Sequence, residues 1–127
     1  MAKQYISKEI DKKYISEEII KKAITMCDEN FWSYLDALQV AAELSKSNLA
    51  IVGVELYERI NNYPKWIATS NYNYDKLLLL WDKFAEFCNK SAIEFIKSNK
   101  DPKNILFNFS YVYKGEIEEI KKRKRIA

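Results

Sequence analysis

The stretch that most constrains the fold is the run Leu-Ala-Ile-Val-Gly-Val-Glu-Leu-Tyr-Glu at residues 49–58. Its β-branched residues recur over more than six positions, which predicts a β-strand over residues 49–59. Successive residues of a strand face opposite sides, so Val52, Val54 and Leu56 share one face that suits a core. The opposite face suits a recognition surface or a buried polar site, and it is predicted to hold Ile51, Gly53, Glu55, Tyr57 and Arg59.

Apolar residues at helical spacing predict three helices. The first covers residues 16–30 after an N-cap at Ser16, and the second begins after Ser33 and ends at residues 45–48. The third begins near residue 75 and either continues to Asn99 or restarts at Ser91, where Ser-Ala-Ile-Glu fits a capping box and favours a break. The predicted apolar face of the second helix holds Leu35, Leu38, Ala41 and Ala42, and Asp36, Gln39 and Glu43 are expected on its solvent side.

Two further strands complete the prediction. The turn Asn-Asn-Tyr-Pro at residues 61–64 joins the strand at residues 49–59 to a second strand at residues 65–69, forming a hairpin. Residues 105–113 alternate strictly and predict a strand whose aromatic face lies in the core. The fold class is therefore α+β: a small antiparallel sheet packed against helices in a single domain, in the order α-α-β-β-α-β. The domain covers residues 1–115, and residues 116–127 form a charged tail or a short terminal helix.

Composition excludes several kinds of site. The chain has no histidine, which excludes Ser-His-Asp and Cys-His catalysis and any histidine metal site. Cys27 and Cys88 match no zinc spacing and are expected as buried free thiols. No apolar run reaches the roughly 18 residues of a membrane helix, and the first residues lack a signal-peptide core. We therefore expect a cytoplasmic protein with no metal, no cofactor and no membrane contact.

Charge is unevenly placed along the chain, whose formal net charge is +3. Residues 14–60 carry four basic and eight acidic side chains, so this segment has a net charge of −4. An acidic segment in a basic chain favours a docking surface for a basic partner, although ordinary solvated faces would give the same count. The acidic residues concerned are Asp28, Glu29, Asp36, Glu43, Glu55 and Glu58.

Aromatic and asparagine side chains alternate after the predicted hairpin turn. Tyrosine and asparagine together are typical of protein-binding surfaces. We expect Trp66 in the core, and Tyr72 and Tyr74 at least partly exposed. The basic run at residues 121–125, Lys-Lys-Arg-Lys-Arg, could contact phosphates or anionic lipid, or could be a solvated terminus.

The run Asn-Leu-Ala-Ile-Val-Gly-Val-Glu-Leu-Tyr-Glu at residues 48–58, followed by Pro64 and Trp66, resembles immunity proteins of bacterial polymorphic toxin systems, including contact-dependent inhibition systems. The resemblance covers residues 31–75 and includes Trp32 and Asp36. It implies a small cytoplasmic α+β protein without enzymatic activity, which binds a cognate toxin domain and blocks its active site or a nearby surface. Glu55, Glu58 and Asp36 are the matching positions that the resemblance assigns to toxin contact or to supporting that surface.

These observations support three functional hypotheses. The first is an immunity protein that binds a basic toxin surface. The second is a small nucleic-acid-binding or regulatory module that uses the basic tail and exposed aromatics. The third is a carboxylate-dependent enzyme, which would need an enclosed pocket that holds Glu55 beside Tyr57 or Arg59. For the first, the predicted partner-binding residues are Asp36, Glu43, Glu55, Tyr57, Glu58, Tyr72 and Tyr74.

Overall fold

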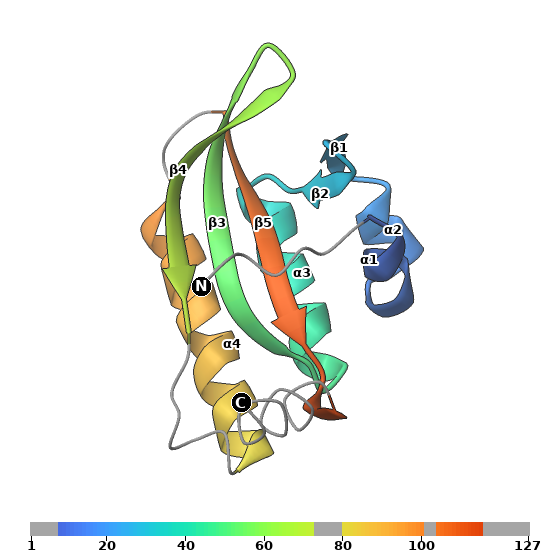
Figure 1. Ribbon diagram of the computed structural model, residues 1–127, viewed down its shortest axis with the longest axis vertical. Helices are drawn as coiled ribbons and strands as arrows, with labels where there is room; N and C mark the ends of the chain where they lie inside the picture. The colour runs from blue at the N-terminus through green and yellow to red at the C-terminus, as the bar shows by residue number, and fades with distance from the viewer. Residues whose placement is uncertain (1–7, 73–79, 101–103, 116–127) are drawn as a thin grey trace, which may run out of the picture.

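The computed structural model describes residues 8–72, 80–100 and 104–115 (Figure 1). Four helices and five strands lie within these residues, and they confirm the predicted α+β fold class. In chain order the elements are α1 (Lys8–Tyr14), α2 (Glu17–Ile20), β1 (Ile24–Met26), β2 (Glu29–Phe31), α3 (Tyr34–Lys46), β3 (Ala50–Ile60), β4 (Tyr63–Asn71), α4 (Trp81–Ser98) and β5 (Ile105–Val112).

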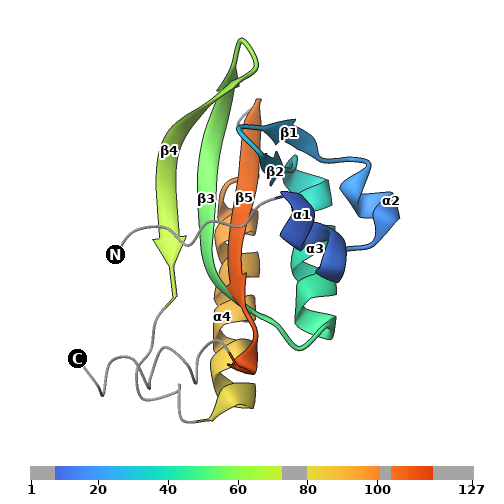
Figure 2. The ribbon, with the colours of Figure 1, turned by 45° about the vertical axis from the view of Figure 1, so that its right-hand side comes forward.

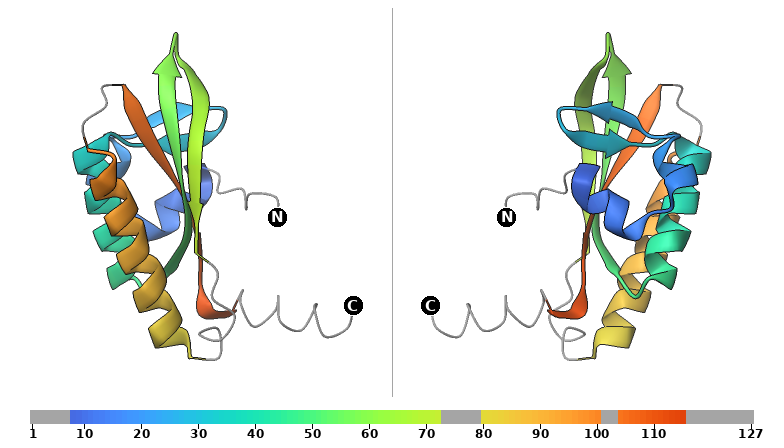
Figure 3. Two further views of the ribbon diagram at one scale, coloured as in Figure 1. Left: turned by 90° about the vertical axis from the view of Figure 1, so that its left-hand side faces the viewer. Right: turned by 90° about the vertical axis from the view of Figure 1, so that its right-hand side faces the viewer.

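The core is a two-layer arrangement of a sheet and helices. Strands β4, β3 and β5 form an antiparallel sheet in that order, with β3 in the centre. Helices α3 and α4 cover one face of this sheet, and α1 and α2 lie beyond the edge strand β5 (Figures 1 and 3). The opposite face, which we call the open face, carries no described helix. The β3–β4 hairpin extends well beyond the rest of the sheet (Figure 2).

A β-bulge at Val52 changes the faces that the alternation predicts. Ile51 pairs with Tyr111 and Gly53 pairs with Ser110, so one extra residue of β3 lies between two consecutive residues of β5. Ile51 therefore shares the helix-covered face and is fully buried, and its predicted place beside Gly53 and Glu55 is wrong. The side chain of Asn89 in α4 supports this point, because its Oδ1 accepts the Ile51 N–H at 2.8 Å and its Nδ2 donates to the Leu49 carbonyl at 2.9 Å.

The predicted helix over residues 16–30 is wrong beyond its first turn. Only Glu17–Ile20 is helical, and a second small sheet follows, in which β1 pairs with β2. Cys27 and Asp28 occupy the turn with φ of 52° and 62°, the left-handed geometry of a two-residue hairpin turn. Neither residue is the glycine or asparagine that normally signals this turn, so the apolar spacing alone suggested a continuous helix.

Helix α3 confirms the predicted boundaries but uses a different face. Its buried residues are Ala37, Val40, Ala41 and Leu44. Leu35 is 71% exposed and Ala42 is exposed as well, so the predicted places of both residues in the core are wrong. Small residues on the buried face let α3 approach the sheet closely, whereas the larger Leu35 and half-buried Leu38 lie to either side.

Helix α4 and strand β5 complete the helix-covered core. Helix α4 runs unbroken from Trp81 to Ser98, so the predicted restart at Ser91 is wrong; its predicted start near residue 75 lies outside the described residues. Trp81, Phe84, Ala85 and Cys88 are buried, as the apolar spacing predicts. Leu80, which the same spacing places on this stripe, is 61% exposed, and Leu77 lies outside the described residues. Strand β5 confirms the predicted strand, and Phe107, Phe109 and Tyr111 of its aromatic face are buried as expected. Tyr113, predicted on the same buried face, follows the end of β5 and is 46% exposed, so its predicted burial is wrong.

Trp32 joins the N-terminal elements to the sheet. Its backbone N–H and C=O both bond with Phe107, at 2.9 and 2.8 Å. Its indole is buried and donates from Nε1 to the Ile19 carbonyl at 3.2 Å. The tryptophan named in the resemblance is thus part of the core.

The two cysteines are expected to differ in their reaction with a thiol reagent. Cys27 lies exposed in the β1–β2 turn, which contradicts its predicted burial, whereas Cys88 is buried and burial raises its pKa to about 12. Because the thiolate is the reactive form, iodoacetamide at pH 8 should modify one thiol per folded chain and both thiols in denaturant. Mass spectrometry of peptides identifies the modified residue. Equal modification of both cysteines in the folded chain would contradict the burial of Cys88.

Candidate functional site

The open face of the sheet gathers polar side chains from three strands. The strand register places Glu55 between Asn108 of β5 and Thr69 of β4, and Gly53 between Ser110 and Asn71. Directly opposed residues of neighbouring strands share a face and lie within about 5.5 Å of each other at Cβ. The sheet thus confirms the prediction that Gly53, Glu55 and Tyr57 share a polar face.

Glu55 is the most buried acid of this face, with 8% of its surface exposed. Its Oε2 accepts the Tyr57 hydroxyl at 2.8 Å. Burial raises the pKa of Tyr57, and the hydrogen bond and charge of Glu55 raise it further. The Tyr57 hydroxyl is therefore a fixed donor. Arg59 is exposed and donates from Nη2 to Asn62 Oδ1 at 2.6 Å.

Asn108 is a site residue that the sequence reasoning missed. It is 3% exposed, and its Nδ2 donates to the Asn30 carbonyl at 2.9 Å, which fixes the orientation of the amide. Its buried Oδ1 has no hydrogen-bond partner among residues 8–72, 80–100 and 104–115. The available signal was an asparagine in the middle of the otherwise apolar and aromatic run Ile-Leu-Phe-Asn-Phe.

The β1–β2 hairpin borders the open face. A small apolar cluster of Met26, Phe31 and Leu106 forms beneath it, and Ile24 and Tyr57 pack against this cluster. The rings of Phe31 and Tyr57 meet edge to face at 5.1 Å. Figure 3 shows the hairpin projecting past the sheet on the side away from α4. The hairpin therefore forms a wall beside Glu55 and Asn108.

A buried polar network around Asp11 holds this wall in place. Asp11 accepts the Tyr111 hydroxyl at 2.6 Å on Oδ1 and the Asn30 amide at 2.9 Å on Oδ2. Asn30 in turn accepts the Thr25 hydroxyl at 2.9 Å. Burial raises the pKa of Asp11 to about 6; the hydrogen bonds from Tyr111 and Asn30 lower it, and the charge of Glu29 raises it. One carboxyl thus ties α1 to β2 and β5.

The structure does not bring the predicted acidic residues together on one surface. Asp36 accepts the Ser33 hydroxyl at 3.2 Å and lies 3.9 Å from Lys22 Nζ. Glu43 accepts the Ser16 backbone N–H at 2.9 Å and so fixes the start of α2. Both belong to the side of α3 that meets α2, whereas Glu55 lies on the open face. Glu58 pairs with Lys65 and Ile105 near the hairpin end of β3.

The β3–β4 hairpin exposes large apolar side chains, two of them aromatic. Tyr63 is 66% exposed and Trp66 is 57% exposed, so the predicted burial of Trp66 is wrong. Trp66 lies on an edge strand beside a second bulge, at Ile67, and its Nε1 donates to Thr69 Oγ1 at 2.7 Å. Ile60 and Ile67 are exposed as well. We call these four residues the hairpin patch.

The predicted exposure of Tyr72 is wrong, and Tyr74 lies outside the described residues. Tyr72 is 8% exposed, and its backbone N–H donates to the Val52 carbonyl at 2.9 Å. This bond continues the β3–β4 ladder one residue beyond the Gly53–Asn71 pair. The basic run at residues 121–125 also lies outside the described residues.

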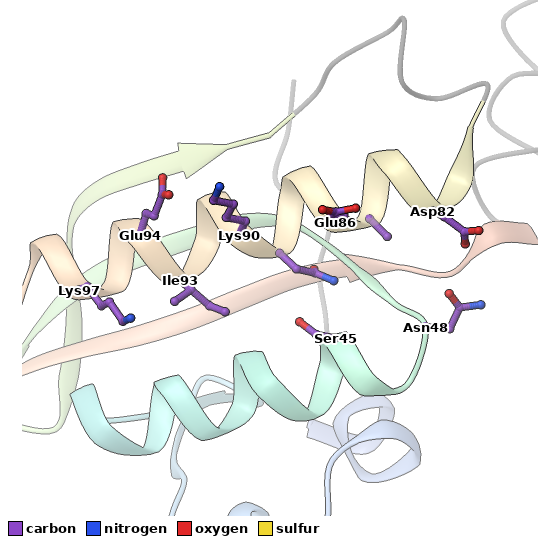
Figure 4. A pocket seen from close by; sticks show the side chains of 10 residues that line it. Ser45, Asn48, Asp82, Glu86, Lys90, Ile93, Glu94 and Lys97 are labelled. Atoms are coloured by element: carbon purple, nitrogen blue, oxygen red, sulfur yellow. The ribbon is translucent and has the colours of Figure 1, made fainter.

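A groove of about 570 Å³ lies along α4 beside the end of α3 (Figure 4). Figure 4 shows Glu86, Lys90, Glu94 and Lys97 projecting from successive turns of α4 along it. Their alternating charges suit mutual compensation along a solvated helix. The groove therefore indicates no particular class of ligand.

No protein-family model matches the sequence, and no curated protein matches it significantly. No helix within the described ranges is both long and apolar enough to cross a membrane. Among those same residues, no group of three or more cysteine, aspartate or glutamate side chains is arranged to hold a metal ion.

Proposed function

We propose that this chain is an immunity protein that binds and neutralises a cognate protein toxin in the cytoplasm, and that it has no catalytic activity of its own. The contact surface consists of the hairpin patch and the adjoining open face, with Glu55 and Tyr57 at its centre. Asp36 and Glu43 support the packing of the N-terminal helices, and Glu58 lies at the margin of the contact.

The observation that carries the proposal is the exposure of Trp66 and Tyr63 on a protruding β-hairpin. Exposed aromatic side chains on rigid backbone are typical of the residues that dominate protein–protein binding energy. The hydrogen bond from Trp66 Nε1 to Thr69 holds the indole in one orientation, so little side-chain entropy is lost on binding. A protruding hairpin also fits a concave partner such as an active-site cleft.

The chemistry of the open face also favours binding over catalysis. The raised pKa of Tyr57 keeps its hydroxyl protonated at physiological pH, which suits a hydrogen-bond donor and does not suit a general base. Glu55 is engaged by that same hydroxyl. The pair is therefore suited to hold a partner group in a fixed geometry.

The proposal is tested by co-purification followed by a growth assay. The tagged chain is recovered from the bacterium that encodes it, and stoichiometric partners are identified by mass spectrometry. We expect a C-terminal fragment of a large secreted protein, whose expression alone arrests growth and whose effect disappears when this chain is co-expressed. A partner whose toxicity the chain does not relieve would overturn the proposal.

A chain that lacks residues 121–127 is the matched control in both assays. Removal of this basic end should leave neutralisation intact if the hairpin patch and open face carry binding. Recovery of nucleic acid alone, lost in the shortened chain, would instead favour the nucleic-acid-binding module.

A further inference from the structure

Glu55 and Asn108 place hydrogen-bond acceptors side by side on the open face. The two residues are direct cross-strand partners, and both are more than nine-tenths buried. Asn108 Oδ1 is held by the bond from its own Nδ2 to Asn30, and it lacks a donor among the described residues. A buried acceptor without a donor destabilises the folded state, so a ligand that supplies the donor recovers that free energy.

The surroundings add further acceptors and negative charge. Gly53 has no side chain, so it leaves the open face uncovered next to Glu55. Asn71 Oδ1 lies 3.0 Å from the point that a Cβ atom on residue 53 would occupy. The Ser70 carbonyl lies 3.6 Å from the same point. The charges of Glu55 and Glu29 both act on Tyr57, so both carboxylates are near this part of the face. The site therefore fits a cation that donates several hydrogen bonds.

Because Glu55 and Asn108 are both buried, only a narrow cationic side chain can reach them. Thr69 and Asn71 are exposed on the edge strand, so the site is approached across β4. One strand spacing is about 4.8 Å, a distance that the flexible four-carbon stem of lysine can span. A lysine ammonium is compact and carries three donors, whereas the planar guanidinium of arginine needs a wider opening.

We propose that Glu55 and Asn108 form an ammonium-binding site on the open face, which receives a lysine side chain of the partner protein. This inference rests on the proposed function for the identity of the partner, although the site can be tested without it. The lysine stem would lie across β4 beside Trp66, and its ammonium would donate to the Glu55 carboxylate and to Asn108 Oδ1.

The site is tested by NMR titration of the full chain with Nα-acetyl-lysine methylamide. We expect saturable shifts of the Asn108 side-chain amide signals with this probe. The arginine analogue should bind about fivefold or more weakly, and the norleucine analogue, which lacks the charge, should cause no saturable shift. Absence of a saturable shift at Asn108 with the lysine probe would overturn the site.

Two matched variants separate the site from general electrostatics. Glu55→Gln keeps an oxygen for the Tyr57 hydroxyl but removes the charge, and we expect about tenfold weaker binding of the lysine probe. Glu86→Gln removes the same charge from α4, which covers the other face of the sheet, and should leave binding unchanged. Equal weakening by both variants would overturn the site in favour of nonspecific charge attraction.

The two proposals fail in distinguishable ways. In one outcome, the lysine probe shifts the Asn108 signals with an affinity that Glu55→Gln lowers, while the chain relieves no toxin. That result supports the ammonium site and contradicts the immunity function. If the chain relieves a toxin and the lysine probe leaves Asn108 unmoved, the immunity function stands and the ammonium site falls.

Discussion

Replacing Asp11 with asparagine is expected to remove a large pH dependence from the stability of this chain and to stabilise it at neutral pH. Burial raises the pKa of Asp11 from 3.8 to about 6. A carboxyl with a raised pKa holds its proton more tightly in the folded state, so its ionisation opposes folding. The wild-type chain should therefore lose stability as the pH rises from about 4 to about 6.

The size of this effect follows from the shift in pKa. About two pKa units correspond to about 3 kcal/mol of the free energy of unfolding. The wild-type chain has lost this amount once the pH is above about 6. In Asp11→Asn the amide oxygen accepts from Asn30, and the amide N–H donates to the Tyr111 oxygen, so both bonds of the network survive. The variant should be more stable than the wild type at pH 7 by up to about 3 kcal/mol.

Urea unfolding of both chains between pH 4 and pH 7.5 measures this difference. The other carboxyl groups are common to the two chains. The difference between the two free energies of unfolding at each pH therefore measures the effect of Asp11 ionisation alone. Glu9→Gln is the control, because Glu9 lies on the same helix, exposed and paired with Lys12 at 3.2 Å. If the free energy of unfolding changes with pH in the same way for the wild type and for Asp11→Asn, the ionisation of Asp11 does not oppose folding and the prediction is wrong.

Replacing Trp66 with alanine is expected to weaken toxin binding about 30-fold or more, which corresponds to about 2 kcal/mol. The indole presents the largest rigid apolar area of the hairpin patch and is 57% exposed in the free chain. Because so much of the ring already meets solvent, the free energy of unfolding should change by about 0.5 kcal/mol or less. Calorimetric titration with a catalytically inactive toxin domain measures the affinity.

Leu35→Ala is the matched control for Trp66→Ala. Leu35 is 71% exposed and apolar, but it lies on α3, away from the hairpin patch. Its loss should leave the dissociation constant unchanged. If Leu35→Ala weakens binding as much as Trp66→Ala does, the contact surface lies on the helical layer and the hairpin patch is the wrong surface.

The sequence predicted those elements whose pattern is local. The strands at residues 49–59 and 105–113 and the hairpin turn at residues 61–64 carry strict alternation or turn residues, and all of them appear in the structure. The β1–β2 hairpin was missed because Cys27 and Asp28 adopt left-handed backbone with neither glycine nor asparagine in the turn. Apolar residues at residues 20–31 suit a helix by spacing, yet they serve two separate clusters in the fold.

The candidate site was predicted only in part, because strand register and edge position are not local properties. Gly53, Glu55 and Tyr57 share a face by alternation alone, so their grouping could be read from one strand. Asn108 joins them through pairing with a strand more than fifty positions later, which nothing in the local pattern specifies. Trp66 has the large apolar side chain of a typical core residue. It is exposed because it lies on the edge strand β4.

The position of β5 at the end of the domain has a consequence for biosynthesis. This strand pairs with β3, and it supplies the Tyr111 hydroxyl to Asp11 across 100 positions and the Asn108 amide to Asn30 across 78. Contacts of such long sequence separation form slowly, and none of these can form until the last strand has left the ribosome. A chain interrupted before residue 105 lacks one side of the sheet and the contacts of Phe107, Asn108 and Tyr111 that anchor the β1–β2 wall. The finished surface therefore forms only in chains that include β5.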